Sequence, residues 1–456
     1  MSRSTLSRLR GRVLAGDTGG AVVMLVAALA AVVLVNAGGA AVYDRLVLHE
    51  IVLNIGGLDR LSGLSVRSWV NDGAMTFFFL LVTLQIKEDL VRGDLRHPRV
   101  AALPVVAAVG GMVVPAALYL SLNAGGPAAH GWGVPMATDI AFAVAVVALA
   151  GDRVPPGGRL LLLALAVVDD LGAIAVIAVF YTDGLRLSWL GVAVAMVAVA
   201  ALCLRAGLRA PLLHVVLGVV CWFSLHESGV HPTMAGVAFG FLVPVTPHRD
   251  PSTLARCGQR LLGDIARHLA TFPGSSPTVT PAAAVAELHR LTQACRSPLD
   301  RLTGRLTGWV VFGVVPVFAF TNAGVPFDPA SISDPLQQRV ALGVGLGLLV
   351  GKVLGVFGSV WLVCRLTLLR MPRGVTTRHL LGLGMCAGVG FTVALFISDL
   401  ASPDPAVTTA AKGGVMIGSL LAGVVGYLVL RSCPRSGEFL AHDDPSSPRV
   451  VVTSTS

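Results

Sequence analysis

The sequence has few charged residues and almost no lysine. Asp, Glu, Lys and Arg make up 13% of its 456 residues, whereas a soluble domain carries about 25%. Lysine occurs only at positions 87, 352 and 412, and the other basic residues are arginines. With a hydrophobic fraction of 54%, this composition excludes an ordinary soluble domain and indicates a polytopic membrane protein.

Cysteine and histidine patterns typical of metal sites are missing as well. The seven cysteines are scattered and include no CxxC pair. The eleven histidines form neither an HxxxH nor an HExxH pattern, so no zinc site is indicated. We therefore expect no cofactor.

Long apolar runs dominate the chain instead. Runs near the ~20 residues needed to cross a bilayer occur at twelve places. They lie around 20–40, 70–91, 101–121, 131–150, 159–181, 188–205, 211–225, 229–245, 309–323, 338–364, 380–399 and 407–431. The predicted fold is therefore an all-α polytopic membrane protein with twelve transmembrane helices.

The basic residues orient these helices. Most of the 34 lie in the tails and in the loops that share a side with them. The opposite side holds only Arg45, Arg60, Arg67, Arg186, Arg339 and Lys412. By the positive-inside rule both termini are cytoplasmic. Because topology explains the net charge of +9, a nucleic-acid partner is unnecessary.

The connecting segments divide the chain further. We expect a cytoplasmic segment 1–19, helices 1–8 in 20–245, a long basic cytoplasmic loop 246–307, helices 9–12 in 308–431 and a disordered tail 432–456. The first apolar run is read as a retained span rather than a cleaved signal, because it is long.

Two of these connecting segments each fit two different structures. The outer region 43–68 contains residues 51–66, which suggest a β-hairpin or a bare loop. The loop 246–307 contains a helical spacing of leucines beside arginines, typical of an interfacial helix, although a solvated linker fits equally.

Two adjacent acids interrupt the apolar run of residues 160–180. A carboxylate at the bilayer centre costs about 2.5–3.5 kcal/mol, so Asp169 and Asp170 must face protein, water, a proton or a cation. Adjacent helical residues point about 100° apart, so the two cannot face one spot. A functional role is favoured over a purely structural one.

Lys352 and Asp139 are further charges inside predicted spans. Lysine can release its proton when desolvated, which arginine effectively cannot, so Lys352 suits a proton-handling site; a structural ion pair is the alternative. Asp139 follows Pro135 and Thr138, which would interrupt a helix.

A second interruption is predicted in the span 380–399. Gly382, Gly384, Gly388 and Gly390 precede Phe391 and Thr392 there. Close helix packing would explain the glycines taken alone. Two interrupted spans in separate halves of a chain are, however, typical of a transporter site where half-helix ends meet.

Two further polar residues lie near the outer ends of spans. Asp72 is either part of this machinery or a solvated helix N-cap. His231 could titrate near neutral pH, or it could be an ordinary interfacial histidine.

With these residues in view, the chain resembles the NhaA family of sodium/proton antiporters. The resembling motifs are WVNDGAMTFFFLLV (69–82), ATDIAFA (137–143), ALAVVDDLGAIAVIAVFYT (164–182), SGVHPTMAGV (228–237), VFAFTNAGV (317–325), LLVGKVLG (348–355) and GVGFTVALFISDLA (388–401). The resemblance implies twelve helices, with helices 3–5 and 10–12 as inverted repeats whose broken helices 4 and 11 cross.

The resemblance also assigns roles to individual residues. It implies that Asp139 and Asp170 bind the transported cation and protons, with Thr138 beside them, and that Asp169 pairs with Lys352. Asp72 corresponds to an acidic residue on the family's second helix, and we expect Asp72, Thr392 and Gly390 to be supporting or gating positions. The region 51–66 corresponds to the hairpin that pairs two protomers, and the expected location is the bacterial cell membrane.

The cytoplasmic end of the second helix departs from the family. The typical GLEVKREL is TLQIKEDL here, so Gln85 replaces a glutamate and Glu88 an arginine, beside Asp89. Thr303-Gly304 stands where a Glu-His pair is common. Together with His231 these positions belong to the pH response, so pH activation of the usual kind is in doubt.

The expected activity is transport rather than enzymatic catalysis: electrogenic export of Na⁺, or Li⁺, in exchange for H⁺. One rival is another ion-coupled transporter, for example of an organic anion, but no intramembrane arginine cluster is present to receive an anion. The second rival is an intramembrane aspartyl protease, but the aspartates of this chain do not lie in the YD and GxGD motifs of such proteases.

Overall fold

The fold is described from a computed structural model of the whole chain. The residues described are 3–51, 64–182, 184–208, 210–246, 296–327, 334–366 and 374–434, together with the single positions 259, 263, 369, 371 and 372. The predicted interfacial helix in 246–307 and most of the predicted disordered tail lie outside the described residues.

The described part of the chain is almost entirely helical, in agreement with the predicted class. Its main helices are α1 (Arg3–Leu34), α2 (Ala40–Val47), α3 (Val66–Ser68), α4 (Met75–Val91), α5 (Pro98–Asn123), α6 (Ile140–Ala150), α7 (Pro156–Phe180), α8 (Leu187–Arg205), α9 (Pro211–Ser228), α10 (Met234–Leu242), α13 (Pro298–Trp309), α14 (Val315–Asn322), α16 (Pro335–Leu346), α17 (Lys352–Arg365), α18 (Thr377–Ala387), α19 (Phe391–Ala401) and α20 (Pro405–Arg431).

Nine of these helical stretches are long and apolar enough to cross a membrane, and a bent pair, α18 with α19, would make ten within the described residues. The two remaining runs of the predicted twelve coincide with α4 and α10, which have 17 and 9 helical residues. A multi-pass membrane protein is thus supported, and the count of twelve stays a prediction.

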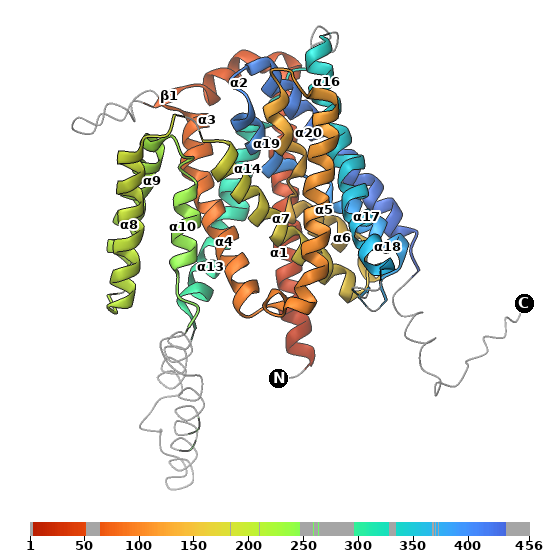
Figure 1. The fold of residues 1–456 in the computed structure, drawn as a ribbon, viewed down its shortest axis with the longest axis horizontal. Helices are drawn as coiled ribbons and strands as arrows, with labels where there is room; N and C mark the ends of the chain where they lie inside the picture. Colours follow the sequence, from red (N-terminus) through yellow and green to blue (C-terminus); the bar gives the residue numbers. More distant parts are fainter. Residues whose placement is uncertain are drawn as a thin grey trace, which may run out of the picture.

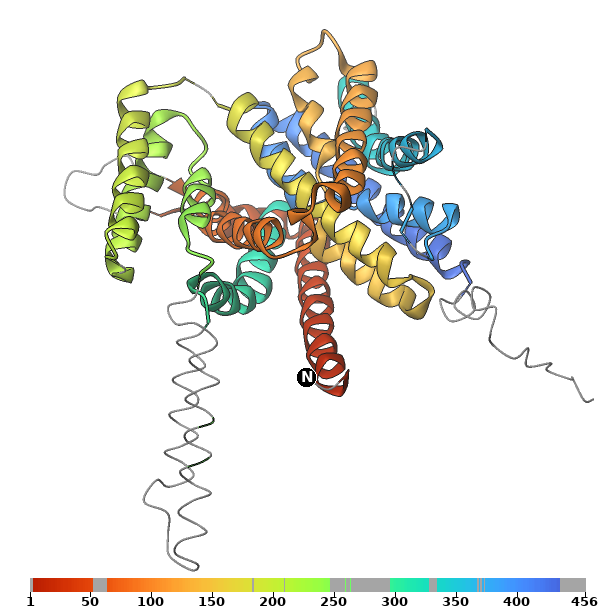
Figure 2. The ribbon, with the colours of Figure 1, turned by 60° about the horizontal axis from the view of Figure 1, so that its bottom comes forward.

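The helices stand side by side with α1 near the centre (Figure 1). The start of α1 lies at the lower end of that view, and α2 and β1 lie at the upper end. The helices α8 and α9 pack on each other at one edge, where α10 joins them to α4 (Figure 2). The helices α5, α16, α17, α18 and α20 form the opposite side, in which α5 packs on α17 and α20 on α16.

Glycine allows the closest of these helix contacts. A Cβ on Gly355 of α17 would lie 2.2 Å from the carbonyl oxygen of Gly110 in α5. Neither position can carry a side chain without moving the two helices apart, as expected for small-residue packing in membranes.

The outer region forms a short pair of strands. Glu50–Ile51 (β1) and Leu64–Ser65 (β2) pair antiparallel, with Glu50 opposite Ser65. Residues 52–63 between them lie outside the described part of the chain. We call the end of the bundle that carries β1 and β2 the hairpin end.

The ninth predicted span begins earlier than expected. Helix runs without a gap over residues 298–322, so it includes part of the segment expected to be loop up to residue 307. Ser297 and Asp300 form a capping box, with Pro298 at the first helical position. These start signals are visible in the sequence and explain the earlier boundary.

Candidate functional site

Two interrupted helical segments meet in the middle of the bundle. The helix Ala129–Met136 is followed by extended backbone at Ala137 and Asp139 before α6 begins at Ile140. In the second segment α18 and α19 are bent by 46° at a break that contains Gly388 and Gly390. The amide of Asp139 donates to the carbonyl of Val389 at 2.6 Å, so each break supplies a partner for the other's backbone.

The second break is held from α20. The amides of Gly390 and Phe391 both donate to Ser419 Oγ at 3.2 Å. A Cβ on Gly390 would lie 2.9 Å from the carbonyl oxygen of Ala137, so glycine is required for this approach. Gly390 therefore shapes the crossing rather than binding anything itself.

Asp139 lies buried at this crossing. One carboxylate oxygen, Oδ1, accepts from the amide of Phe142 at 3.1 Å and so caps α6. The other, Oδ2, accepts from the hydroxyl and the amide of Thr392 at 2.7 and 3.2 Å. Because the donors come from both interrupted segments, the carboxylate is fixed in position between them.

Asp169 points toward α17. Its Oδ2 accepts from Lys352 Nζ at 2.5 Å and from Thr138 Oγ1 at 2.7 Å, and both charged side chains are fully buried. Thr138 Oγ1 also lies 2.8 Å from the carbonyl oxygen of Ala387. Within the described residues, Asp169 Oδ1 is buried without a hydrogen-bond partner, which leaves an acceptor open for a proton or a cation.

Asp170 points in a different direction and lines a cavity. The structure gives its carboxylate no hydrogen bond to the residues that it describes, although it interacts electrostatically with Asp139, Asp169 and Lys352. The predicted division of the adjacent pair thus has a geometric counterpart: one aspartate is paired with Lys352 and its neighbour is not.

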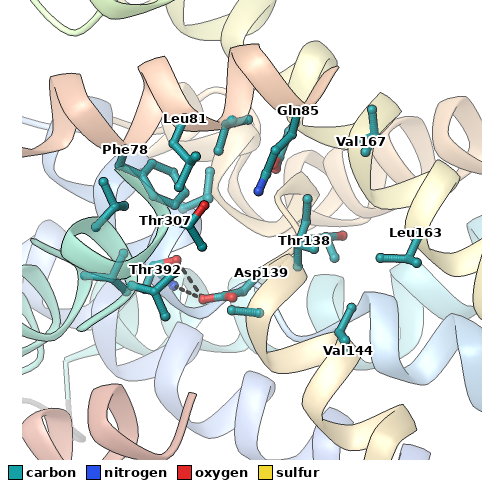
Figure 3. Close-up of a pocket in the computed structure, with 18 of the residues that line it drawn as sticks. Phe78, Leu81, Gln85, Thr138, Asp139, Val144, Leu163, Val167, Thr307 and Thr392 are labelled. Carbon is teal, nitrogen blue, oxygen red and sulfur yellow. Dashed lines mark hydrogen bonds between the residues drawn. The ribbon is translucent and has the colours of Figure 1, made fainter. Parts of the chain in front are cut away.

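The cavity has a volume of about 340 Å³ and contains Thr138, Asp139, Asp170 and Thr392 among its lining residues. Figure 3 shows Asp139 joined to Thr392, with Thr138 nearby and Gln85 on the helix opposite. Apolar side chains, Phe78 and Leu81 on one side and Leu163 and Val167 on another, complete the wall. Acidic and hydroxyl side chains thus line one part of the cavity, and apolar side chains line much of the rest.

Three of the predicted pH-response positions also line this cavity. Gln85, Glu88 and Asp89 lie in the last turns of α4, and Thr307 of α13 joins them. Nearby, Arg92 Nη1 forms an ion pair with Asp300 Oδ1 at 2.8 Å. We call this side, opposite the hairpin end, the cavity end.

Asp72 and His231 lie close to each other, and neither is among the residues that line the cavity. His231 Nε2 is 3.5 Å from Asp72 Oδ1, and His226 Nδ1 is 3.9 Å from Asp72 Oδ2. Asp72 lies within the π-helical turn Trp69–Ala74, and the helix is capped upstream by Ser65. The N-cap interpretation of Asp72 is therefore wrong, and the side chain of His231 is largely buried within the protein.

Sequence reasoning missed Ser419 and a polar network at the hairpin end. Ser419 gives no signal, because a serine in an apolar helix usually bonds its own helix backbone. Asp399 and Lys412 could have been found as charges within or near apolar runs, but their pairing at 2.6 Å was not anticipated.

The chemistry of the site suits a small hard cation. Carboxylate, hydroxyl and carbonyl oxygens surround the crossing, and such ligands bind hard cations in preference to soft metals. Among the described residues no group of three or more His, Cys, Asp or Glu side chains is placed to hold a metal ion.

Comparisons with known proteins agree with this chemistry. The Na⁺/H⁺ antiporter 1 family matches residues 11–430. The Na⁺/H⁺ antiporter NhaA of Oleidesulfovibrio alaskensis is 40% identical over 94% of this chain and 94% of its own length. That of an Anaeromyxobacter strain is 41% identical over 91% and 89%.

A relative from Escherichia coli extends the comparison to another lineage. Its Na⁺/H⁺ antiporter NhaA is 38% identical over 92% of this chain and 97% of its own length. The family match over residues 11–430 spans both interrupted segments and the part of the chain that contains the site. The chain therefore belongs to the NhaA family of Na⁺/H⁺ antiporters.

Proposed function

We propose that this protein exports Na⁺, or Li⁺, from the cytoplasm in exchange for H⁺. The observation that carries the proposal is the position of Asp139 and Asp170 at the floor of one cavity, where Asp170 has no hydrogen-bond partner among the described residues. A cation and protons would compete for the same oxygens, and this competition couples the two flows.

The topology proposed for this activity has twelve spans, with both termini in the cytoplasm and the chain in the bacterial cell membrane. Helices 3–5 and 10–12 form inverted repeats, and the broken helices 4 and 11 cross. The bond between Asp139 and Val389 supports this arrangement, because it joins the two interrupted segments. The excess of basic residues on one side supports the orientation.

In the proposed cycle the cavity opens to the cytoplasm and the deprotonated aspartates receive a partly dehydrated cation. Thr392 orients Asp139, and Thr138 lies between the cation site and Asp169. One group of helices then rocks against the other and exposes the site outside, where protons displace the cation. Neutralised carboxylates allow the site to return without cargo.

Lys352 balances the charge of Asp169 through part of this cycle. The pair is fully buried, so either partner left alone would be an uncompensated charge. We propose that a proton enters at this pair in one state, which makes Lys352 or Asp169 the second proton carrier. Exchange of more protons than cations moves net charge, and each charge is worth about 2.3 kcal/mol per 100 mV of membrane potential.

Two further parts of the proposal concern assembly and regulation. The paired strands β1 and β2 lie at the two ends of the region 51–66, which we propose pairs two protomers. Gln85, Glu88 and Asp89 line the cavity. We propose that Gln85 and Glu88, which differ from the residues typical of the family, alter the pH response at the ion entrance. Thr303 and Gly304 on α13 belong to the same altered region.

The test is transport in everted vesicles. A pH gradient made by respiration should collapse when Na⁺ or Li⁺ is added, and not when K⁺ is added. Vesicles carrying Asp170→Asn should keep their gradient under the same conditions. Failure of the wild-type protein to respond to Na⁺ or Li⁺ would refute the proposed function.

A further inference from the structure

Four polar side chains from four helical segments meet at the hairpin end. They are Asn71 from the turn before α4, Asn322 at the end of α14, Asp399 near the end of α19 and Lys412 in α20. Asn322 and Lys412 are buried, and the side chain of Asp399 is only 18% exposed. We call these four residues the hairpin-end network.

The network is closed on itself. Lys412 Nζ donates to Asp399 Oδ1 at 2.6 Å and to Asn322 Oδ1 at 3.2 Å. Asn71 Nδ2 donates to Asp399 Oδ2 at 3.1 Å, and Asn322 Nδ2 donates to Asn71 Oδ1 at 2.8 Å. Both carboxylate oxygens of Asp399 are therefore used, in contrast to Asp170 in the cavity.

One face of α19 connects this network to the ion site. Thr392, Phe396 and Asp399 are spaced by four and three residues, so they lie on one side of the helix. Thr392 binds Asp139, and Asp399 belongs to the network. Between them the ring of Phe396 packs against Phe79 at 5.3 Å and against Phe318 at 6.2 Å between centroids.

The network thus lies beyond an aromatic layer on the side of the ion site away from the cavity. The cavity is lined by residues of the last turns of α4, whereas Asn71 lies before the first turn of that helix. On the proposed function, this layer and this network stand between the ion site and the hairpin end, where a cation that enters through the cavity would leave.

We propose that the hairpin-end network is the closed outer gate of the transport path. This inference rests on the proposed antiport function. The turn that carries Asn71 packs with α4 and α14, and α14, which carries Asn322, packs mainly with α1 and touches α19 less. The helices α19 and α20 pack with each other, and α20 packs with α16 and α18. Opening separates the two asparagines from Asp399 and Lys412.

The distribution of charge explains how such a gate can open. The ion pair Lys412–Asp399 lies within one group of helices and stays intact, so neither charge is left unpaired. Only hydrogen bonds between a charged group and an amide cross the opening, and entering water can replace them.

The test moves the carboxylate across the gate without changing composition. In the double variant Asn322→Asp with Asp399→Asn, Lys412 would pair with residue 322, and opening would have to separate an ion pair. We expect Na⁺-dependent turnover at saturating Na⁺ to fall about tenfold, because hydrogen bonds between charged groups are stronger than those to amides. Turnover equal to the wild type would overturn the gate, provided that the wild type responds to Na⁺ as proposed.

A second experiment does not depend on how the double variant folds. In a background without native cysteines, Phe79→Cys and Phe396→Cys, which face each other in the aromatic layer, are bridged by a short bis-methanethiosulfonate reagent that forms a disulfide with each thiol. We expect bridging to stop antiport and dithiothreitol to restore it, whereas the same reagent on Phe79→Cys alone should not stop antiport. Undiminished antiport in the bridged protein would refute the gate and leave the proposed function standing.

Discussion

The cavity end and the hairpin end treat buried carboxylates in opposite ways. At the cavity floor Asp170 accepts no hydrogen bond from the described residues, and Asp169 leaves one oxygen without a partner. At the hairpin end both oxygens of Asp399 are occupied, one by an ammonium and one by an amide. The molecule therefore contains one acidic site that is incomplete and one that is saturated.

This difference separates binding from closure. A buried polar group without a partner is costly, and a cation or a proton is the partner that removes the cost. A saturated network gains nothing from an added cation and instead holds its helices together. The same residue type thus serves two purposes, according to whether its neighbours already satisfy it.

The largest effect is expected from Asp170→Asn, which removes a charge from the incomplete site. Antiport should fall by at least about a hundredfold, since an interaction with a charged group worth up to about 3 kcal/mol is lost. Asp44→Asn, at an exposed position near the hairpin end, is the matched control. Residual Na⁺-driven antiport close to that of the control would mean that Asp170 is not a ligand.

The next largest effect concerns the contribution of the ion pair Asp169–Lys352 to the stability of the protein. Asp169→Asn leaves a fully buried ammonium without its partner, which should cost about 3–5 kcal/mol of unfolding free energy. Adding Lys352→Met removes that charge and should recover much of the loss. The measurement is thermal unfolding of the purified protein, and a double variant less stable than the single one would contradict the ion pair.

A smaller effect is expected from Thr392→Val, which keeps the shape of the side chain and removes its hydroxyl donor to Asp139. The apparent Michaelis constant for Na⁺ should rise about fivefold, because one hydrogen bond of about 1 kcal/mol no longer orients the carboxylate. Thr392→Ser keeps the donor and should behave as the wild type. Equal constants for valine and serine would show that the hydroxyl is irrelevant.

The smallest effect concerns the cavity entrance. Glu88→Gln removes one negative charge beside the passage, so entry of Na⁺ should weaken by about twofold at low ionic strength and less at high salt. Glu50→Gln makes the same change at the hairpin end. A salt-independent effect, or equal effects of both variants, would argue against attraction at the entrance.

Much of the cavity end could be predicted from the sequence, because isolated charges in apolar runs are costly. Asp139, Asp169, Asp170 and Lys352 were found in this way, and Asp169 was paired with Lys352 by the family resemblance. Pro135 and the glycines around Gly388 indicated the interruptions. In each case the signal is local, within one span.

The contacts across the fold could not be predicted. Asp139 and Val389 meet through backbone groups, which no residue type announces. The network at the hairpin end joins Asn71 to Asp399 over a separation of 328 residues. Asparagine near a helix end is common in any sequence, so only the three-dimensional arrangement shows that it completes a closed polar network.

The most direct test of the account is the release of protons when a cation binds. Calorimetric titration of the purified protein with Li⁺ or Na⁺, in buffers of different ionisation enthalpy, measures how many protons leave as the cation arrives. Competition for Asp139 and Asp170 predicts proton release that disappears, together with cation binding, in Asp170→Asn. Binding of Na⁺ or Li⁺ to the wild-type protein without proton release at any pH would contradict the account.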